Sequence, residues 1–153
     1  MCRDDSLCFR AYAEWRRSAG KMVEQRMPTH PLNWFGGWVL ILIGFASGSL
    51  LGLFFHREEF LGGYASFRRR IIRLGHIALV ALGMMNVLFG ISPGPTAARW
   101  QAQAGSICFL AGGIAMPAVC FLTGWRGWYQ RFFLVPVALL VSAVVLILIG
   151  ALP

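Results

Sequence analysis

The sequence predicts an all-α polytopic membrane protein, an up-down bundle of four transmembrane helices. Four almost uncharged apolar runs occupy most of the chain, and each is close to the roughly 20 helical residues that span the hydrocarbon layer of a bilayer. Hydrophobic residues make up 58% of the 153 residues and charged residues 13%, which leaves too little polar surface for a water-soluble domain. The runs are continuous rather than alternating, which favours helices over the strands of a β-barrel.

The first two spans are expected at residues 34–55 and 71–91. Trp34 opens the first span, as is typical of aromatic rings at the membrane interface, and the charged residues after position 56 end it. The second span follows an arginine-rich stretch and ends before the Pro-Gly-Pro sequence at residues 93–95, which breaks the chain.

The third and fourth spans are expected at residues 101–123 and 132–152. Pro117 predicts a kink in the third span, and glycines separate the third span from the fourth. Because the connections between spans are short, consecutive helices are expected to be antiparallel neighbours. Together they form one four-helix membrane domain, residues 34–153.

A polar tail, residues 1–33, precedes the membrane domain. Its first 26 residues contain no apolar core of the kind that a signal peptide needs. Met27 is an alternative initiator, and we expect translation to start there, with residues 1–26 as an upstream extension. The alternative is a genuine solvated or interfacial tail.

Arginines gather on one side of the predicted bundle. Without the tail, the opposite side holds only Arg99, so the positive-inside rule places the connections 56–70 and 124–131 in the cytoplasm of a bacterial-type cell and both termini outside. Counting the tail adds six cations to the opposite side and leaves the orientation open. The cations of the basic side are Arg57, Arg68, Arg69, Arg70, Arg73, Arg126 and Arg131.

The net charge of +8 points to lipid rather than to nucleic acid as the partner. The cations flank membrane helices, where attraction to anionic head groups is worth about 1 kcal/mol for each cation. No motif that reads nucleic-acid bases accompanies them. The candidates for binding lipid head groups are Arg68, Arg69, Arg70 and Arg73.

Small residues at helical spacing predict close helix packing, either inside the bundle or between copies of the chain. Asn86, near the middle of the second span, needs a hydrogen-bond partner because an unpaired amide in hydrocarbon is costly. The candidate packing residues are Gly44, Gly48 and Gly52 on the first span, Gly75, Gly83 and Asn86 on the second, and Gly105 and Gly112 on the third.

His56 and His76 form the one constellation that suggests a cofactor. The first ends one span and the second begins the next, so an antiparallel hairpin is expected to bring them to similar depth, with Glu58 and Glu59 nearby. Two imidazoles and a carboxylate suit a transition metal, and two imidazoles suit haem. The alternative is that His56 caps its helix and His76 forms an ordinary hydrogen bond.

The chain carries no phosphate-binding glycine loop, HExxH, GxSxG or paired acidic motif for magnesium. We therefore expect a non-catalytic integral membrane protein without a cofactor, an accessory or assembly subunit that packs against other membrane subunits or against itself. One alternative is a small redox protein that handles haem or a metal through His76 and His56. The other is a small-solute channel with a polar path around Asn86 and Ser106.

Overall fold

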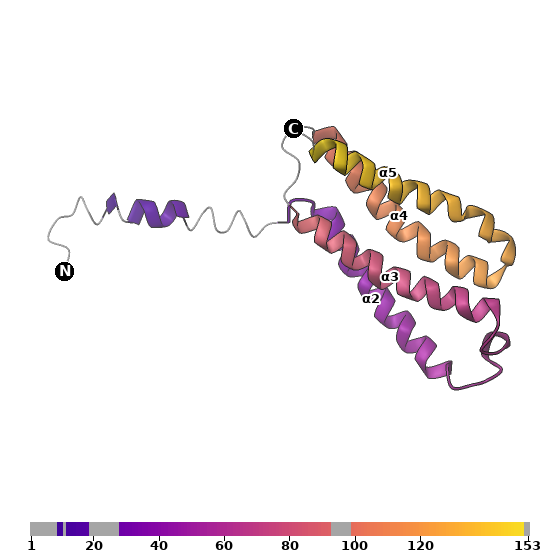
Figure 1. The fold of residues 1–153 in the computed structure, drawn as a ribbon. Helices are drawn as coiled ribbons and strands as arrows, with labels where there is room; N and C mark the ends of the chain where they lie inside the picture. Colours follow the sequence, from indigo (N-terminus) through magenta and orange to yellow (C-terminus); the bar gives the residue numbers. More distant parts are fainter. Residues whose placement is uncertain (1–8, 11, 19–27, 93–98, 152–153) are drawn as a thin grey trace, which may run out of the picture.

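The computed structural model describes residues 9–10, 12–18, 28–92 and 99–151, and every long element in these residues is a helix. Met27 and the Pro-Gly-Pro sequence at residues 93–95 lie outside the described residues. The four long helices are α2 (Pro31–Phe54), α3 (Phe67–Ile91), α4 (Arg99–Trp125) and α5 (Leu134–Ala151), and the short 3-10 helices η1 (Phe60–Gly62) and η2 (Gly127–Phe133) lie in two of the connections (Figure 1).

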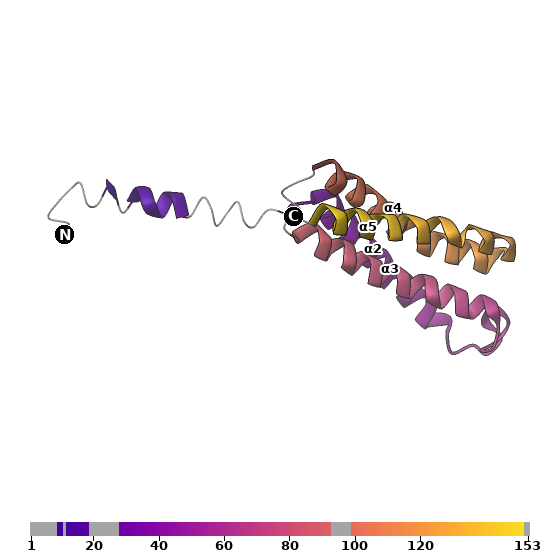
Figure 2. The ribbon, with the colours of Figure 1, turned by 45° about the horizontal axis from the view of Figure 1, so that its top comes forward.

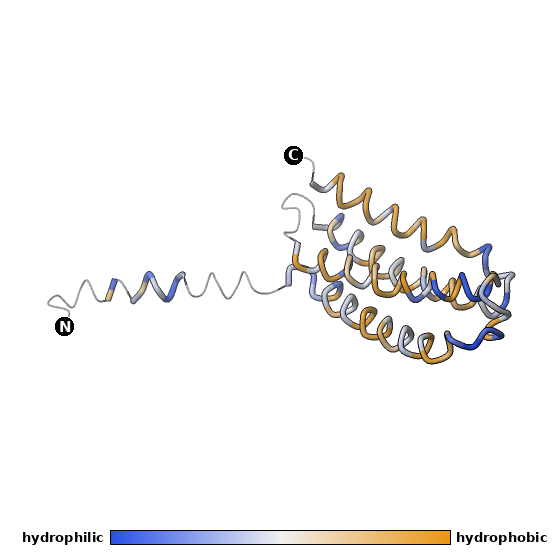
Figure 3. The backbone as a smooth tube through the Cα atoms, turned by 60° about the horizontal axis from the view of Figure 1, so that its bottom comes forward, coloured by the Kyte–Doolittle hydropathy of each residue, from blue (hydrophilic) through white to orange (hydrophobic). Residues whose placement is uncertain are grey.

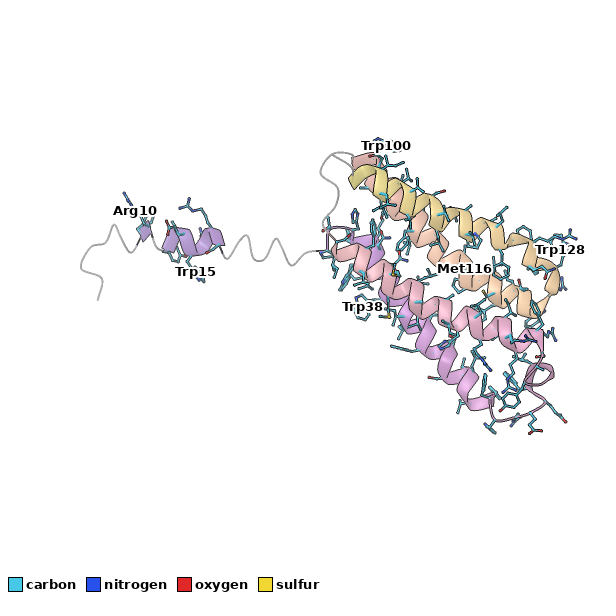
Figure 4. All side chains as sticks on the ribbon, viewed as in Figure 1. Arg10, Trp15, Trp38, Trp100, Met116 and Trp128 are labelled. Atoms are coloured by element: carbon cyan, nitrogen blue, oxygen red, sulfur yellow. The ribbon has the colours of Figure 1, made fainter. Side chains whose placement is uncertain are left out.

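Four helical segments of the described residues are long and apolar enough to cross a membrane, with mean hydropathy from 1.9 to 3.1. Figure 3 shows these apolar stretches along the helices, with hydrophilic residues gathered at the end that holds the α2–α3 and α4–α5 connections. The predicted fold class is therefore confirmed: the chain is an all-α polytopic membrane protein. Trp100 and Trp128 lie at opposite ends of the α4–α5 hairpin (Figure 4).

Helices α2, α3 and α4 begin earlier in the chain than the hydropathy pattern predicted, and the first two by the most. Pro31 stands at the first helical position of α2, where proline loses no hydrogen bond and its fixed φ suits the helix. Ser66 caps α3, because its Oγ accepts a hydrogen bond from the backbone N–H of Arg69 at 3.2 Å. Three arginines assigned to a connection, Arg68, Arg69 and Arg70, therefore lie in the first turns of α3.

The bundle consists of two antiparallel hairpins, α2–α3 and α4–α5, joined along α3 and α4 (Figures 1 and 2). Helix α2 also touches α4, whereas α5 packs mainly against α4 and lies at one edge. The buried residues of α5 are Pro136, Ala143 and Gly150, and their spacing of seven places them along one seam of the helix. Most of the surface of α5 is therefore left uncovered by the rest of the chain.

Helices α2 and α3 approach each other most closely where α2 begins. A Cβ atom added to Gly37 would lie 2.6 Å from the carbonyl oxygen of Gly83, and one added to Gly90 would lie 2.8 Å from the backbone nitrogen of Trp34. Toward the other end the two helices separate, and a Cβ atom added to Gly52 would meet nothing within 4 Å. The α2–α3 hairpin is thus tightly closed at one end and open at the other.

Candidate functional site

A neutral polar cluster joins three helices at the closed end of the bundle. Asn33 on α2, Asn86 on α3 and Ser106 on α4 are buried, and we call them the asparagine cluster. The side-chain nitrogen of Asn33 donates to Oδ1 of Asn86 at 2.9 Å and to the carbonyl of Ser106 at 3.1 Å. The Ser106 hydroxyl donates to Oδ1 of Asn33, and Nδ2 of Asn86 donates to the Leu82 carbonyl at 2.9 Å.

The asparagine cluster supplies the partner that Asn86 was expected to need. That partner, Asn33, was missed because the sequence analysis assigned residues 1–33 to the tail. Pro31 was the available signal, since proline at a first helical position extends α2 over Asn33. Each hydrogen bond of this kind is worth on the order of 1 kcal/mol between membrane helices.

The same cluster bears on the expectation of a channel around Asn86 and Ser106. Asn33 and Asn86 are fully buried, and their side chains bond within the cluster or to their own helix. A cavity of about 220 Å³ lies beside Ser106, but its other lining residues are apolar. These polar groups hold helices together instead of facing a passage.

A charged cluster occupies the opposite end of the bundle. Arg69 and Arg73 of α3 lie against Phe55, which follows α2, and Arg69 also lies against Tyr64; we call these four residues the arginine cluster. The guanidinium carbon of Arg69 is 4.2 Å from the Phe55 ring centroid and 3.8 Å from that of Tyr64, and the guanidinium carbon of Arg73 is 4.7 Å from the Phe55 centroid. Such contacts stabilise a cation by about 0.5–2 kcal/mol each.

Arg69 is the most deeply buried charge of the described residues, with 1% of its surface exposed. Its Nη2 donates to the Phe55 carbonyl, whereas Nε and Nη1 have no hydrogen-bond partner among the described residues. The guanidinium of Arg69 is therefore covered, unlike the exposed side chains of Arg68, Arg70 and Arg73. Hydropathy alone could not show this, because the connection folds Tyr64 back over the guanidinium.

The neighbouring arginines bind the ends of other segments. Arg68 donates from Nε to the Gly124 carbonyl and from Nη2 to the Trp125 carbonyl, both at 2.9 Å. These carbonyls belong to the last turn of α4, where a cation offsets the negative end of the helix dipole. Arg70 donates to the Ala65 carbonyl at 2.7 Å. The exposed side chains of Arg68, Arg70 and Arg73 remain candidates for head-group contact.

The structure does not bring His56 and His76 together as a site. His76 lies inside the bundle, with Nδ1 3.2 Å from the Ser47 hydroxyl and its ring against Gly48, whereas His56 is exposed in the connection after α2. Among the described residues, no three His, Cys, Asp or Glu side chains form a group that could hold a metal ion, so Glu58 and Glu59 do not complete one either. His56 and His76 lie at different depths because α3 begins earlier in the chain than expected.

The predicted packing glycines face neighbouring helices with one exception. Gly44, Gly48 and Gly83 lie in the α2–α3 contact, Gly75 lies against Cys120 of α4, and Gly105 and Gly112 lie against α5. The exception is Gly52, which has no neighbour within 4 Å of an added Cβ. The seams therefore serve contacts within the chain, and Gly37 belongs to them although it was not predicted.

Comparison of the chain with known protein families, with curated proteins and with solved structures finds no match. The function is therefore inferred from the residues of this chain and their contacts.

Proposed function

We propose that the protein is a non-catalytic accessory or assembly subunit that associates sideways, within the membrane, with another membrane subunit or with a second copy of itself. Support comes first from the use of polar groups at membrane depth. Asn33, Asn86 and Ser106 bond to one another, and His76 contacts Ser47, so these groups serve the fold. What remains for function is the outer surface.

The observation that carries the proposal is Ser142. This hydroxyl lies midway along α5, on a side that no other helix of the described chain covers, and Ala138, one turn earlier, is also exposed. Polar side chains at the middle of a membrane helix are commonly turned toward another helix, and two small residues four apart let a second backbone come close.

The proposed membrane is a bacterial-type plasma membrane, with the arginine cluster on the cytoplasmic side. The first and third connections lie at one end of the bundle, and their cations with them, which supports this orientation under the positive-inside rule. Single cysteines placed at Glu58 and Gln130 test it with an impermeant thiol reagent. Labelling of intact cells at these positions would show that the two connections lie outside the cell and would contradict the proposed orientation.

The association is tested with the full tagged chain expressed in its own membrane, extracted gently and analysed by mass spectrometry. We expect either a co-purifying membrane protein or a self-associated form. Ser142→Leu should weaken this association, because the larger side chain keeps a second helix from approaching α5 closely. Val137→Leu on the same helix should not weaken it. A chain that is monomeric and free of partners after in-membrane cross-linking, for the unmodified protein and both variants, would refute the proposal.

A further inference from the structure

The arginine cluster is incomplete as a set of hydrogen bonds. Arg69 is 1% exposed, and two of its nitrogens, Nε and Nη1, have no acceptor in the part of the chain that the structure describes. Buried donors of a charged group without partners are rare in proteins, because each one costs its full desolvation energy. Such a group calls for an acceptor that the described chain does not supply.

Arg73 adds a second cation to the same place. It lies one helical turn after Arg69 and contacts the same Phe55 ring, and like charges four residues apart on a helix repel each other. The nearby carboxylates do not relieve this repulsion: Glu58 and Glu59 are exposed in the connection and provide no partner for the free nitrogens of Arg69. An anion next to both guanidinium groups would relieve it.

We infer that a phosphate group binds between Arg69 and Arg73. The planar guanidinium presents paired N–H donors that match phosphate oxygens, which makes arginine the side chain best suited to this anion. The site lies in the first turns of α3, at the membrane end where phospholipid phosphates are found. This site is additional to the proposed association and does not depend on it.

Access to the two arginines differs. Arg73 is exposed, whereas Nε and Nη1 of Arg69 lie beneath neighbouring side chains. Tyr64, which covers Arg69, is itself 58% exposed and is held by one long hydrogen bond of 3.4 Å to the Phe55 carbonyl. We therefore expect Tyr64 to move aside when a phosphate that is bound to Arg73 reaches Arg69.

The phosphate could be the head group of an anionic phospholipid or inorganic phosphate, and the experiment separates the two. The full chain is purified in maltoside micelles, which contain no phosphate. Phosphatidylglycerol, inorganic phosphate or a phosphate-free glycolipid is then added, and bound molecules are counted by native mass spectrometry while the unfolding temperature is followed. We expect binding and a raised unfolding temperature with phosphatidylglycerol, or with inorganic phosphate if that is the ligand, and neither effect with the glycolipid.

Three substitutions decide whether the site is specific. Arg73→Gln should weaken phosphate binding about tenfold, the usual effect of losing a charge-assisted hydrogen bond. Arg126→Gln removes the same charge from an exposed side chain in the α4–α5 connection, outside the cluster, and should leave binding nearly unchanged. Arg73→Lys keeps the charge but loses the paired donors, and it should bind more weakly while folding normally. Equal losses in Arg126→Gln and Arg73→Gln, or no binding of either phosphate compound by the unmodified chain, would overturn the inference.

Discussion

The asparagine cluster and the arginine cluster lie at opposite ends of one bundle. Both bury polar side chains, but they differ in whether those side chains find hydrogen-bond partners. The asparagine cluster is neutral, and its side chains find partners within the chain, where α2 and α3 are in backbone contact through Gly37 and Gly83. The arginine cluster is charged and keeps two donors without partners, where α2 and α3 have separated. A side-chain amide can be satisfied by another amide and a carbonyl, whereas a guanidinium has five donors, and the described residues supply Arg69 with one acceptor. The asparagine cluster is therefore complete by itself, and the arginine cluster depends on its surroundings.

The largest expected effect comes from adding a methyl group between α2 and α3 at the end that holds the asparagine cluster. Gly37→Ala should destabilise the fold by about 3 kcal/mol, because the new Cβ would lie 2.6 Å from the Gly83 carbonyl oxygen and neither backbone can move easily. Gly52→Ala is the matched control and should be neutral or stabilising by up to about 1 kcal/mol, since its Cβ meets nothing within 4 Å. Unfolding in a denaturing detergent measures both. Equal effects would show that the two ends are equally packed.

The next effect comes from removing a member of the asparagine cluster. Asn33→Leu should cost about 2 kcal/mol, because it leaves Oδ1 of Asn86 and the hydroxyl of Ser106 without their partner. Ser49→Ala serves as the control, because that hydroxyl is exposed and donates only to Phe45 in its own helix. The same unfolding measurement applies. A cost no greater than that of Ser49→Ala would mean that the cluster does not hold the helices.

A smaller effect on stability, which depends on whether phospholipid is present, is expected at the arginine cluster. Arg69→Met in phosphate-free micelles should change the unfolding free energy by less than about 1 kcal/mol, because the lost ring contacts are offset by the removal of buried donors without partners. With phosphatidylglycerol present, the same substitution should become clearly destabilising. Parallel unfolding measurements in the two conditions give the difference, and a large cost without lipid would show that this end is also complete by itself.

The smallest expected effect is a pH dependence of stability at the end of the bundle that holds the asparagine cluster. His30, just before α2, stacks on Phe89 at 4.6 Å, and its Nε2 is buried without a partner. Burial lowers the pKa of His30 below its ordinary value of 6.5, so the unfolded chain takes up a proton at higher pH than the folded chain. The stability that this contact provides is therefore complete above pH 6.5 and declines as the pH falls below it. The unfolding temperature on either side of that pH measures it, and the decline should be smaller in His30→Gln.

The sequence predicted the four helices, their order and the basic end, because these depend on local composition measured against the thickness of a bilayer. It also predicted that Asn86 needs a partner. It did not identify Asn33 as that partner, since the start of α2 depends on Pro31 and not on hydropathy. Nor did it separate Arg69 from the exposed Arg68, Arg70 and Arg73, which share its charge and its position beside the second span.

What the amino-acid order determined by itself is that the chain has four membrane-spanning helices and that the cations of its membrane domain, Arg99 apart, lie at one end. The burial of Arg69 beneath Tyr64, the contact of His76 with Gly48 and the divergence of α2 from α3 were decided only by the tertiary structure. The physical reason is that hydropathy adds up along one helix, residue by residue, whereas burial of a side chain depends on which other backbone passes beside it. That choice is made by the crossing of the helices, where a glycine in the right place admits a neighbour and a larger residue excludes it.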